Sequence, residues 1–362
     1  MKKNPSAGGA EEALSQLSPL ATLDISGGDK ALIISDFHMG AGRYNDFENN
    51  GGLVSEILEN YYYKGGWNLI LNGDIEELQL NRFSDIQNCW SDVYRIFDLF
   101  AAEGRLFKNL GNHDEELVIE KNYPYELYNA VRIDTGSRPV YVYHGHQSSK
   151  VYTDYNNLIR AGNRYFFRPM GFHNISSARS PRRRFHVEKQ AYVFSLKNHC
   201  ISVIGHTHRA LFESLGRFDF IKFEIERLCR DYPGSGAADR ERIAGEVVAL
   251  RAELRKLRRS ERRDVLRQSL YGDELPVPCL FNSGSSIGKK GITAIELDNR
   301  NISLVYWFNE GAGRKFIYRG WYRIEHFPGS SCCRAVLNHD RLDYVNARIE
   351  LLGQSLEIPE QT

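Results

Sequence analysis

The sequence predicts an α/β fold, and three observations support this prediction. Short apolar runs end abruptly in polar residues, as buried strands do. Helical stretches separate the early runs, and strands that alternate with helices are typical of layered sheets. The chain has 362 residues, 42% hydrophobic and 26% charged, so it can bury a sizeable core. A sheet with helices packed on it is therefore expected.

The expected elements follow in chain order. Residues 1–29, rich in Ala, Gly and Ser, are expected to form a flexible leader, with one domain over 30–362. Strands are predicted at 31–35, 67–71, 105–110, 140–143, 200–204, 278–281, 292–297 and 302–308. Helices are predicted at 53–63 and 89–102. A turn at 298–301 would join the last two strands as a hairpin.

Two segments interrupt this alternation. Residues 147–198 interleave aromatic side chains with arginines and are interpreted as a lid-like insert. Residues 218–271 are strongly charged, with leucines at helical spacing, and predict an amphipathic helical hairpin. This hairpin would serve as a packing or homodimer element, or as a basic surface for nucleic acid or anionic lipid.

Charge and composition argue against several classes of protein. A formal net charge of +1 disfavours a dedicated nucleic-acid binder, which is usually strongly basic. No run approaches the roughly 20 apolar residues of a membrane-spanning helix, and no apolar core follows the first lysines as in a secretory signal. Six scattered cysteines without CxxC spacing favour reduced thiols. A cytoplasmic protein without a transmembrane segment is expected.

Five polar clusters carry the chemistry, and each directly follows a predicted strand. The clusters are Asp36-Phe37-His38, Gly73-Asp74, Gly111-Asn112-His113-Asp114, His144-Gly145-His146 and Gly205-His206-Thr207-His208. Because ligands bind at the carboxyl ends of strands in an open α/β sheet, the clusters are expected to converge. Their carboxylate, imidazole and amide groups suit Mn, Fe, Zn or Ni. Two ions about 3.5–4 Å apart would use all these ligands and favour in-line displacement at phosphorus.

In this order, the five clusters resemble the motifs of the calcineurin-like metallophosphoesterase superfamily. The resemblance covers residues 36 to 208, and Asn282-Ser283-Gly284-Ser285 resembles the family's later Asn-Pro-Gly-Ser turn, with Ser283 in place of the proline. It implies a four-layer α-β-β-α sandwich with helical insertions. Two facing sheets would have helices outside, and the site would lie at the shared rim of the sheets.

The resemblance also implies two divalent metal ions and their ligands. The expected ligands of the first ion are Asp36, His38, Asp74 and His208. Those of the second ion are Asp74, which would bridge the two ions, Asn112, His144 and His206. The implied reaction is hydrolysis of a phosphomonoester, phosphodiester or pyrophosphate by a hydroxide that bridges the metals.

Other residues are candidates for catalysis and substrate binding. His113 would lie beside the substrate phosphate and protonate or hydrogen-bond the departing oxygen. Glu77 and Asp114 compete as the carboxylate that orients His113, and Asp114 could instead be a helix N-terminal carboxylate. His146 would line the site or stand near it. The side chains of Arg182, Arg183 and Arg184 would bind substrate phosphate, or form a solvated face.

The substrate class is less sharply defined. Leu78 and Asp114 stand where the protein Ser/Thr phosphatase branch has arginine and glutamate, which disfavours that activity. The second motif and the 147–198 insert resemble UDP-2,3-diacylglucosamine hydrolase, although that branch carries arginine where His113 stands. A small-molecule or lipid-precursor phosphoester is therefore favoured over nucleic acid. A non-catalytic metal-binding scaffold is the alternative, but none of the expected ligands is missing.

Overall fold

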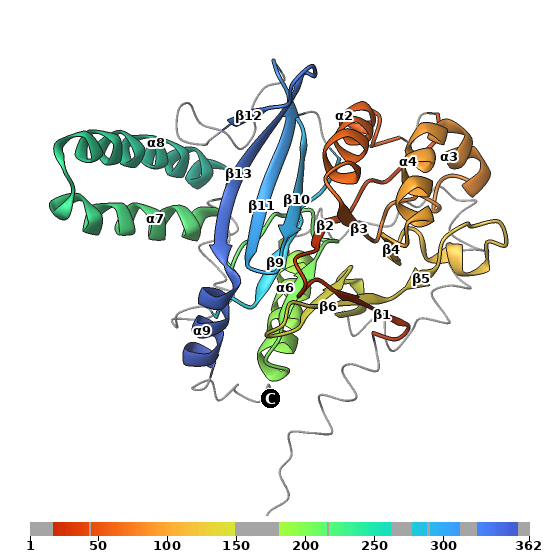
Figure 1. The fold of residues 1–362 in the computed structure, drawn as a ribbon, viewed down its shortest axis with the longest axis horizontal. Helices are drawn as coiled ribbons and strands as arrows, with labels where there is room; N and C mark the ends of the chain where they lie inside the picture. Colours follow the sequence, from red (N-terminus) through yellow and green to blue (C-terminus); the bar gives the residue numbers. More distant parts are fainter. Residues whose placement is uncertain are drawn as a thin grey trace, which may run out of the picture.

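The chain forms a mixed α/β fold built on two mixed sheets (Figure 1). This computed structural model describes residues 17–42, 45–148, 181–215, 217–261, 277–287, 290–311 and 324–353. The smaller sheet has the order β1-β6-β7-β8-β9, and only β6 and β7 pair antiparallel. Its strands are β1 Leu20–Asp24, β6 Ala130–Asp134, β7 Val140–Tyr143, β8 Ile201–Ile204 and β9 Leu280–Asn282.

The larger sheet has eight strands in the order β12-β13-β11-β10-β2-β3-β4-β5. Its parallel half is β2 Lys30–Ile34, β3 Trp67–Asn72, β4 Leu106–Asn109 and β5 Leu127–Tyr128. Its antiparallel half is β10 Ile292–Leu297, β11 Asn301–Asn309, β12 Ile324–His326 and β13 Cys332–Arg341. The parallel half supplies three of the five polar loops described below, after β2, β3 and β4.

The helices pack on the outer faces of the sheets. Over the larger sheet lie α2 Gly51–Ile57, the π-helix η1 Leu58–Tyr63, α3 Phe83–Cys89 and α4 Ser91–Ala102. On the smaller sheet lies α6 Pro181–Lys197, and α9 Leu342–Gly353 follows β13. Short 3-10 turns are η2 Glu115–Ile119 and η3 His146–Ser148.

Strand β2 explains why the larger sheet needs cover on both faces. Ala31 and Ile33 point into a core shared with the smaller sheet, whereas Leu32 and Ile34 point into the core under α2 and α4. All four side chains are fully buried. Because successive side chains in a strand alternate between faces, a continuous apolar run indicates burial on both sides. The strand predicted at 31–35 is therefore buried on both faces, as its apolar run indicates.

Strand β1 lies inside the segment expected to be a flexible leader. Leu20–Asp24 pairs in parallel with β6, and Ala21 and Leu23 are buried while their neighbours are exposed. The expectation of flexibility was therefore wrong for these five residues. The segment's small and polar composition concealed a short period-2 pattern, which is the signature of a half-buried strand.

The predicted lid-like insert is only partly described. Residues 149–180 lie outside the described part of the chain, and 181–197 form α6, which is a core helix. Phe194 of α6 contacts Tyr141 and Tyr143 of β7, with ring centroids 6.3 and 5.8 Å apart. Val187 and Ala191 are buried in the core of the smaller sheet. Helix α6 therefore covers the sheet rather than forming a lid.

Two paired helices occupy the segment in which a helical hairpin was predicted. They are α7 Arg217–Asp231 and α8 Ala237–Glu261, joined by η6 Tyr232–Gly234, and they extend outward beside β12 and β13 (Figure 1). A small separate core between them contains Ile221, Leu228, Ile243 and Leu250. Residues 262–271 of the predicted insert lie outside the described part. None of the described helices is both long enough and apolar enough to cross a membrane.

We expect Tyr62→Phe to lower the free energy of unfolding by about 1–3 kcal/mol. The buried Tyr62 hydroxyl donates to Glu296 Oε1 and accepts from Trp307 Nε1, both at 2.7 Å, so the variant leaves a buried indole N–H without its acceptor. Urea denaturation measures the difference. The control Tyr344→Phe, at a side chain 51% exposed, should change stability by less than about 0.5 kcal/mol. Equal effects of the two variants would contradict this account of Tyr62.

Candidate metal centre

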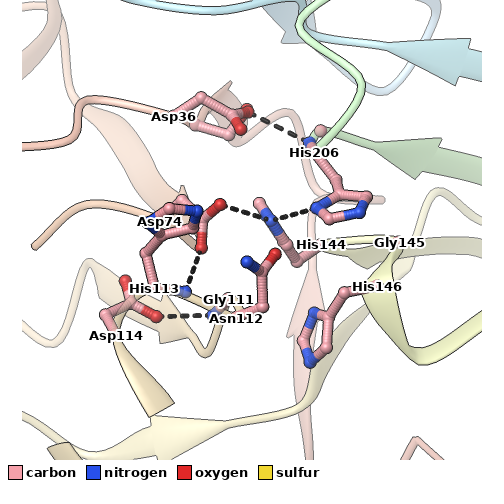
Figure 2. Close-up of polar contacts among 12 residues, drawn as sticks. Asp36, Asp74, Gly111, Asn112, His113, Asp114, His144, Gly145, His146 and His206 are labelled. Carbon is pink, nitrogen blue, oxygen red and sulfur yellow. Dashed lines mark hydrogen bonds and ion pairs between the residues drawn. The ribbon is translucent and has the colours of Figure 1, made fainter. Parts of the chain in front are cut away.

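The loops after five strands meet at one rim shared by the two sheets. Asp36 follows β2, Asp74 follows β3 and Asn112 follows β4 in the larger sheet. His144 follows β7 and His206 follows β8 in the smaller sheet. The two groups are joined directly, since the backbone N–H of His206 donates to Asp36 Oδ2 at 3.1 Å (Figure 2). The convergence expected from the sequence is therefore present.

A first group of possible metal ligands contains Asp36, His38 and His208. His208 Nε2 lies 3.0 Å from Asp36 Oδ1 and 3.3 Å from His38 Nε2. His38 Nδ1 lies 2.9 Å from Glu77 Oε2, which turns Nε2 of the same ring toward the group. A carboxylate behind a metal-binding imidazole is a common arrangement that fixes the ring and its tautomer.

A second group contains Asp74, His144 and His206. His144 Nε2 lies 3.1 Å from Asp74 Oδ2 and 3.2 Å from His206 Nδ1 (Figure 2). His144 Nδ1 donates to the carbonyl oxygen of Asn72 at 2.8 Å, so Nε2 of the same ring points into the group. Each group thus contains one imidazole, His38 or His144, whose opposite ring nitrogen is already bonded.

Asp74 stands between the two groups. Its Oδ2 lies 3.1 Å from His144 Nε2 and 3.9 Å from His38 Nε2, while its Oδ1 accepts the backbone N–H of His113 at 2.8 Å. The Asn112 amide points toward Asp74 and His144 (Figure 2). Among the described residues, no donor reaches the buried Asn112 Oδ1. A buried acceptor without a donor fits a cation at this position.

In the absence of an ion, Asp74 and His206 already have the protonation states of metal ligands, and His144 does not. Burial opposes ionisation of Asp74, but His144, His113 and His38 outweigh burial and hold the Asp74 pKa well below its usual value. Burial and the neighbouring His144 hold the pKa of His206 well below its usual value, so this ring is neutral. Burial lowers the pKa of His144, but Asp74 outweighs burial and raises it to about 9. Because metal ligands must be ionised carboxylates or neutral imidazoles, a divalent cation bound here would displace the proton of His144.

Backbone strain is concentrated at these residues. Positive φ angles of 48–60° occur at Asp36, His38, Asp74, His206 and His208, which are five of the eight described non-glycine residues with positive φ. The left-handed region disfavours side chains with a Cβ, and such strain clusters at functional sites. All five are expected metal ligands.

Two glycines permit the close approach of the loops. A Cβ at Gly111 would lie 2.2 Å from Asp74 Oδ1, and one at Gly73 would lie 2.6 Å from the His144 ring. Gly73 also has a φ of 82°, which a residue with a side chain rarely adopts. Any larger residue at either position would displace an expected metal ligand.

Glu77, and not Asp114, is the carboxylate partner of His113. Nδ1 of His113 lies 2.9 Å from Glu77 Oε1 and 2.8 Å from Oε2. Burial lowers the His113 pKa, but Asp74 and the hydrogen bond with Glu77 outweigh burial and raise the pKa to about 9. The ring is therefore protonated near neutral pH.

Asp114 braces the loops instead, which corrects the expectation that it could orient His113. Its carboxylate accepts the backbone N–H groups of Ile75 and Gly111, at 2.8 and 2.6 Å, and binds Lys108 Nζ at 2.5 Å. It precedes η2 without capping this turn through its side chain. The fully buried Lys108 also contacts Glu76 at 3.1 Å. Sequence reasoning missed Lys108 and Glu76, although a lysine in the interior of strand β4 was a signal that could have been used.

The remaining candidates lie farther from the carboxylates or outside the described part. The ring of His146 lies 5.4 Å from that of His144, but its Nε2 contacts Glu115 at 3.4 Å, and the ring points away from Asp36 and Asp74 (Figure 2). The side chains of Arg182 and Arg183 lie outside the described part. Arg184 is half-buried on α6.

Comparisons with known proteins were made for the whole chain. No protein-family model matches it. No curated protein matches it. Among solved structures, the chain is similar to Yfce, a phosphoesterase from E. coli, with 12% sequence identity and a TM-score of 0.31. The match covers 76% of this chain and 91% of that chain. A likeness this distant assigns neither a family nor an activity.

We expect Glu77→Gln to lower the pKa of His113 by about one unit or more in protein stripped of divalent ions. The folded pKa of about 9 lies above the unfolded value of 6.5, so the pairing stabilises the fold fully below about pH 6.5 and loses this effect as the pH rises through 9. The variant should therefore be more destabilising at pH 6 than at pH 10.

Titration of the imidazole by NMR, with urea denaturation at both pH values, measures these effects. Glu115→Gln is the control, because Glu115 contacts His146. An unchanged His113 midpoint in Glu77→Gln would contradict the pairing.

Proposed function

We propose that this chain is a metal-dependent phosphoesterase that uses two divalent ions, with Mn, Fe, Zn or Ni as candidates. One observation carries the proposal: the carboxylate of Asp74 lies between two groups of ligands, within 3.9 Å of His38 Nε2 and 3.1 Å of His144 Nε2. Asp36 and His208 complete the first group, and His206 with Asn112 completes the second. A carboxylate shared between two such groups is suited to bridging two ions.

The donor set explains why hydrolysis at phosphorus is the proposed reaction. The ions, when bound, would lower the pKa of a water molecule and neutralise charge on the phosphate oxygens. Carboxylate, imidazole and amide donors without thiolate fit divalent ions of borderline or hard character. Asn112 Oδ1 would complete the second ion's ligands, which accounts for its burial without a described donor.

His113 is proposed as the general acid. Its Nδ1 is held by Glu77, so Nε2 is the atom that would deliver a proton to the departing oxygen. The side chain is 13% exposed, which gives a substrate limited access to it. In the protein without bound ions, Asp74 and Glu77 outweigh burial and raise the His113 pKa to about 9, so the ring then carries a proton at neutral pH.

The finer parts of the proposal rest on the sequence motifs and the donor set together. We place the chain in the calcineurin-like metallophosphoesterase superfamily, with a four-layer α-β-β-α sandwich, and favour a small-molecule or lipid-precursor phosphoester as substrate. His146 and Arg182–Arg184 are proposed to contact this substrate. A cytoplasmic location, a lid formed from the 147–180 part of the insert, and a homodimer formed through the 218–271 insert also remain proposals.

Hydrolysis of an aryl phosphodiester and of its monoester counterpart, with Mn²⁺ added, tests the function. The wild-type protein should turn over at least one of the two, and chelation should abolish this turnover. Asp74→Asn should reduce turnover by at least about a hundredfold, because loss of ligands of a metal centre typically costs that much or more.

The matched control is Asp343→Asn, which removes an exposed carboxylate on α9. Its turnover should equal that of the wild type. If the wild-type protein binds Mn²⁺ but hydrolyses neither ester, nor a panel of lipid-linked and nucleotide phosphoesters, the non-catalytic scaffold replaces the proposed enzyme.

A further inference from the structure

Helix α6 carries a buried carboxylate against the back of the loop 205–209. The side chain of Glu188 is fully buried, and its Oε1 accepts the Thr207 hydroxyl at 2.9 Å. Arg209 donates to the same carboxylate twice, from Nε to Oε1 at 3.0 Å and from Nη2 to Oε2. Glu188 thus holds the residues on both sides of His208.

The opposite side of the loop is held by Asn282. Its Nδ2 donates to the Thr207 hydroxyl at 2.9 Å and to the carbonyl oxygen of Gly205 at 3.0 Å. The Thr207 hydroxyl therefore donates to Glu188 and accepts from Asn282, which fixes its orientation. Since Thr207 lies between His206 and His208, fixing it also fixes the two imidazoles relative to each other.

The two histidines need this support. His206 and His208 have φ angles of 60° and 53°, in a region that residues with side chains rarely occupy. Strained backbone conformations persist only where surrounding contacts hold them in place. The His206 and His208 rings face different ligand groups, so relaxation of the loop would alter the distance between the two proposed ion sites.

We propose that Glu188 is a positioning residue that sets the spacing of His206 and His208 and thereby the affinity for the divalent ions that these two rings would hold. This inference rests on the proposed function, because it takes both histidines as metal ligands. Glu188 itself touches no substrate; it acts through Thr207 and Arg209. A buried, charged acceptor of this kind makes stronger hydrogen bonds than a neutral one.

Calorimetric titration of the metal-free protein with Mn²⁺ tests the proposal. The wild-type protein should bind two ions. In Glu188→Ala at least one of the two affinities should fall about 10- to 100-fold, the usual effect of removing a group that orients a metal ligand. Glu188→Gln should lose less affinity, because its amide oxygen still accepts from Thr207. Thr207→Val should also lose affinity while it keeps the Glu188–Arg209 pair, so the test survives if Glu188→Ala fails to fold.

The chain offers a matched control in Glu296. This buried carboxylate also accepts one hydroxyl, from Tyr62 at 2.7 Å, and a forked guanidinium, from Arg334 with Nε at 3.0 Å. It lies on β10, outside the candidate centre. Glu296→Gln should lower the melting temperature at least as much as Glu188→Gln, with an unchanged Mn²⁺ affinity.

The results distinguish the positioning role of Glu188 from the proposed enzyme activity, except where the protein binds no ion. Unchanged affinity in the Glu188 and Thr207 variants would overturn the positioning role, and so would an equal loss in Glu296→Gln, which would indicate general destabilisation. If the wild-type protein binds two ions but hydrolyses no ester, the enzyme proposal fails while the positioning role is still decided by affinity. If the wild-type protein binds no Mn²⁺, both fail.

Discussion

The candidate centre depends on the electrostatic balance of carboxylates buried close together. Asp36 and Asp74 are almost fully buried, and Glu77 is only slightly more exposed. Each of these charges therefore needs a cation or a hydrogen-bond donor within a few ångströms. The surrounding histidines supply this balance, and they hold the pKa of Asp74 well below its usual value and that of Glu77 at about 2. Without these partners the negative charges would repel one another inside the protein. The fold therefore has to deliver histidines from both sheets to the same rim.

The sheets deliver these groups because of their topology. Parallel strands point their carboxyl ends in one direction, so consecutive loops of the larger sheet place Asp36, Asp74 and Asn112 side by side. The smaller sheet adds His144 and His206 from parallel strands β7 and β8. Positive φ angles at five of the expected ligands turn the side chains inward within two to four residues of a strand end.

The polar clusters after the strands predicted which side chains would meet, because their spacing and the order of the strands can be read from the sequence. The residues that hold these loops in place could not be predicted in the same way. Glu188 lies on a helix 19 residues before the loop that it holds, and Lys108 lies inside a strand. Their roles come from tertiary packing, which no local pattern encodes. Strand β1 escaped prediction for the related reason that its pairing with β6 spans more than 100 residues. Glu77 and Asp114 were competing candidates for the partner of His113, and only three-dimensional contacts distinguish them.

The long sequence separations within the centre have a consequence for folding. The hydroxyls of Ser35 and Ser283 meet at 2.8 Å beside Asp36, although 248 positions separate them, and the Ser286 N–H donates to the Asp36 carbonyl. Contacts between such distant residues form only after much of the chain is ordered, since closing long loops has an entropic cost. We therefore expect the rim to form late in folding. A partly synthesised chain ending before β9 would contain every expected metal ligand and still lack the contacts that Ser283 and Ser286 make with Ser35 and Asp36.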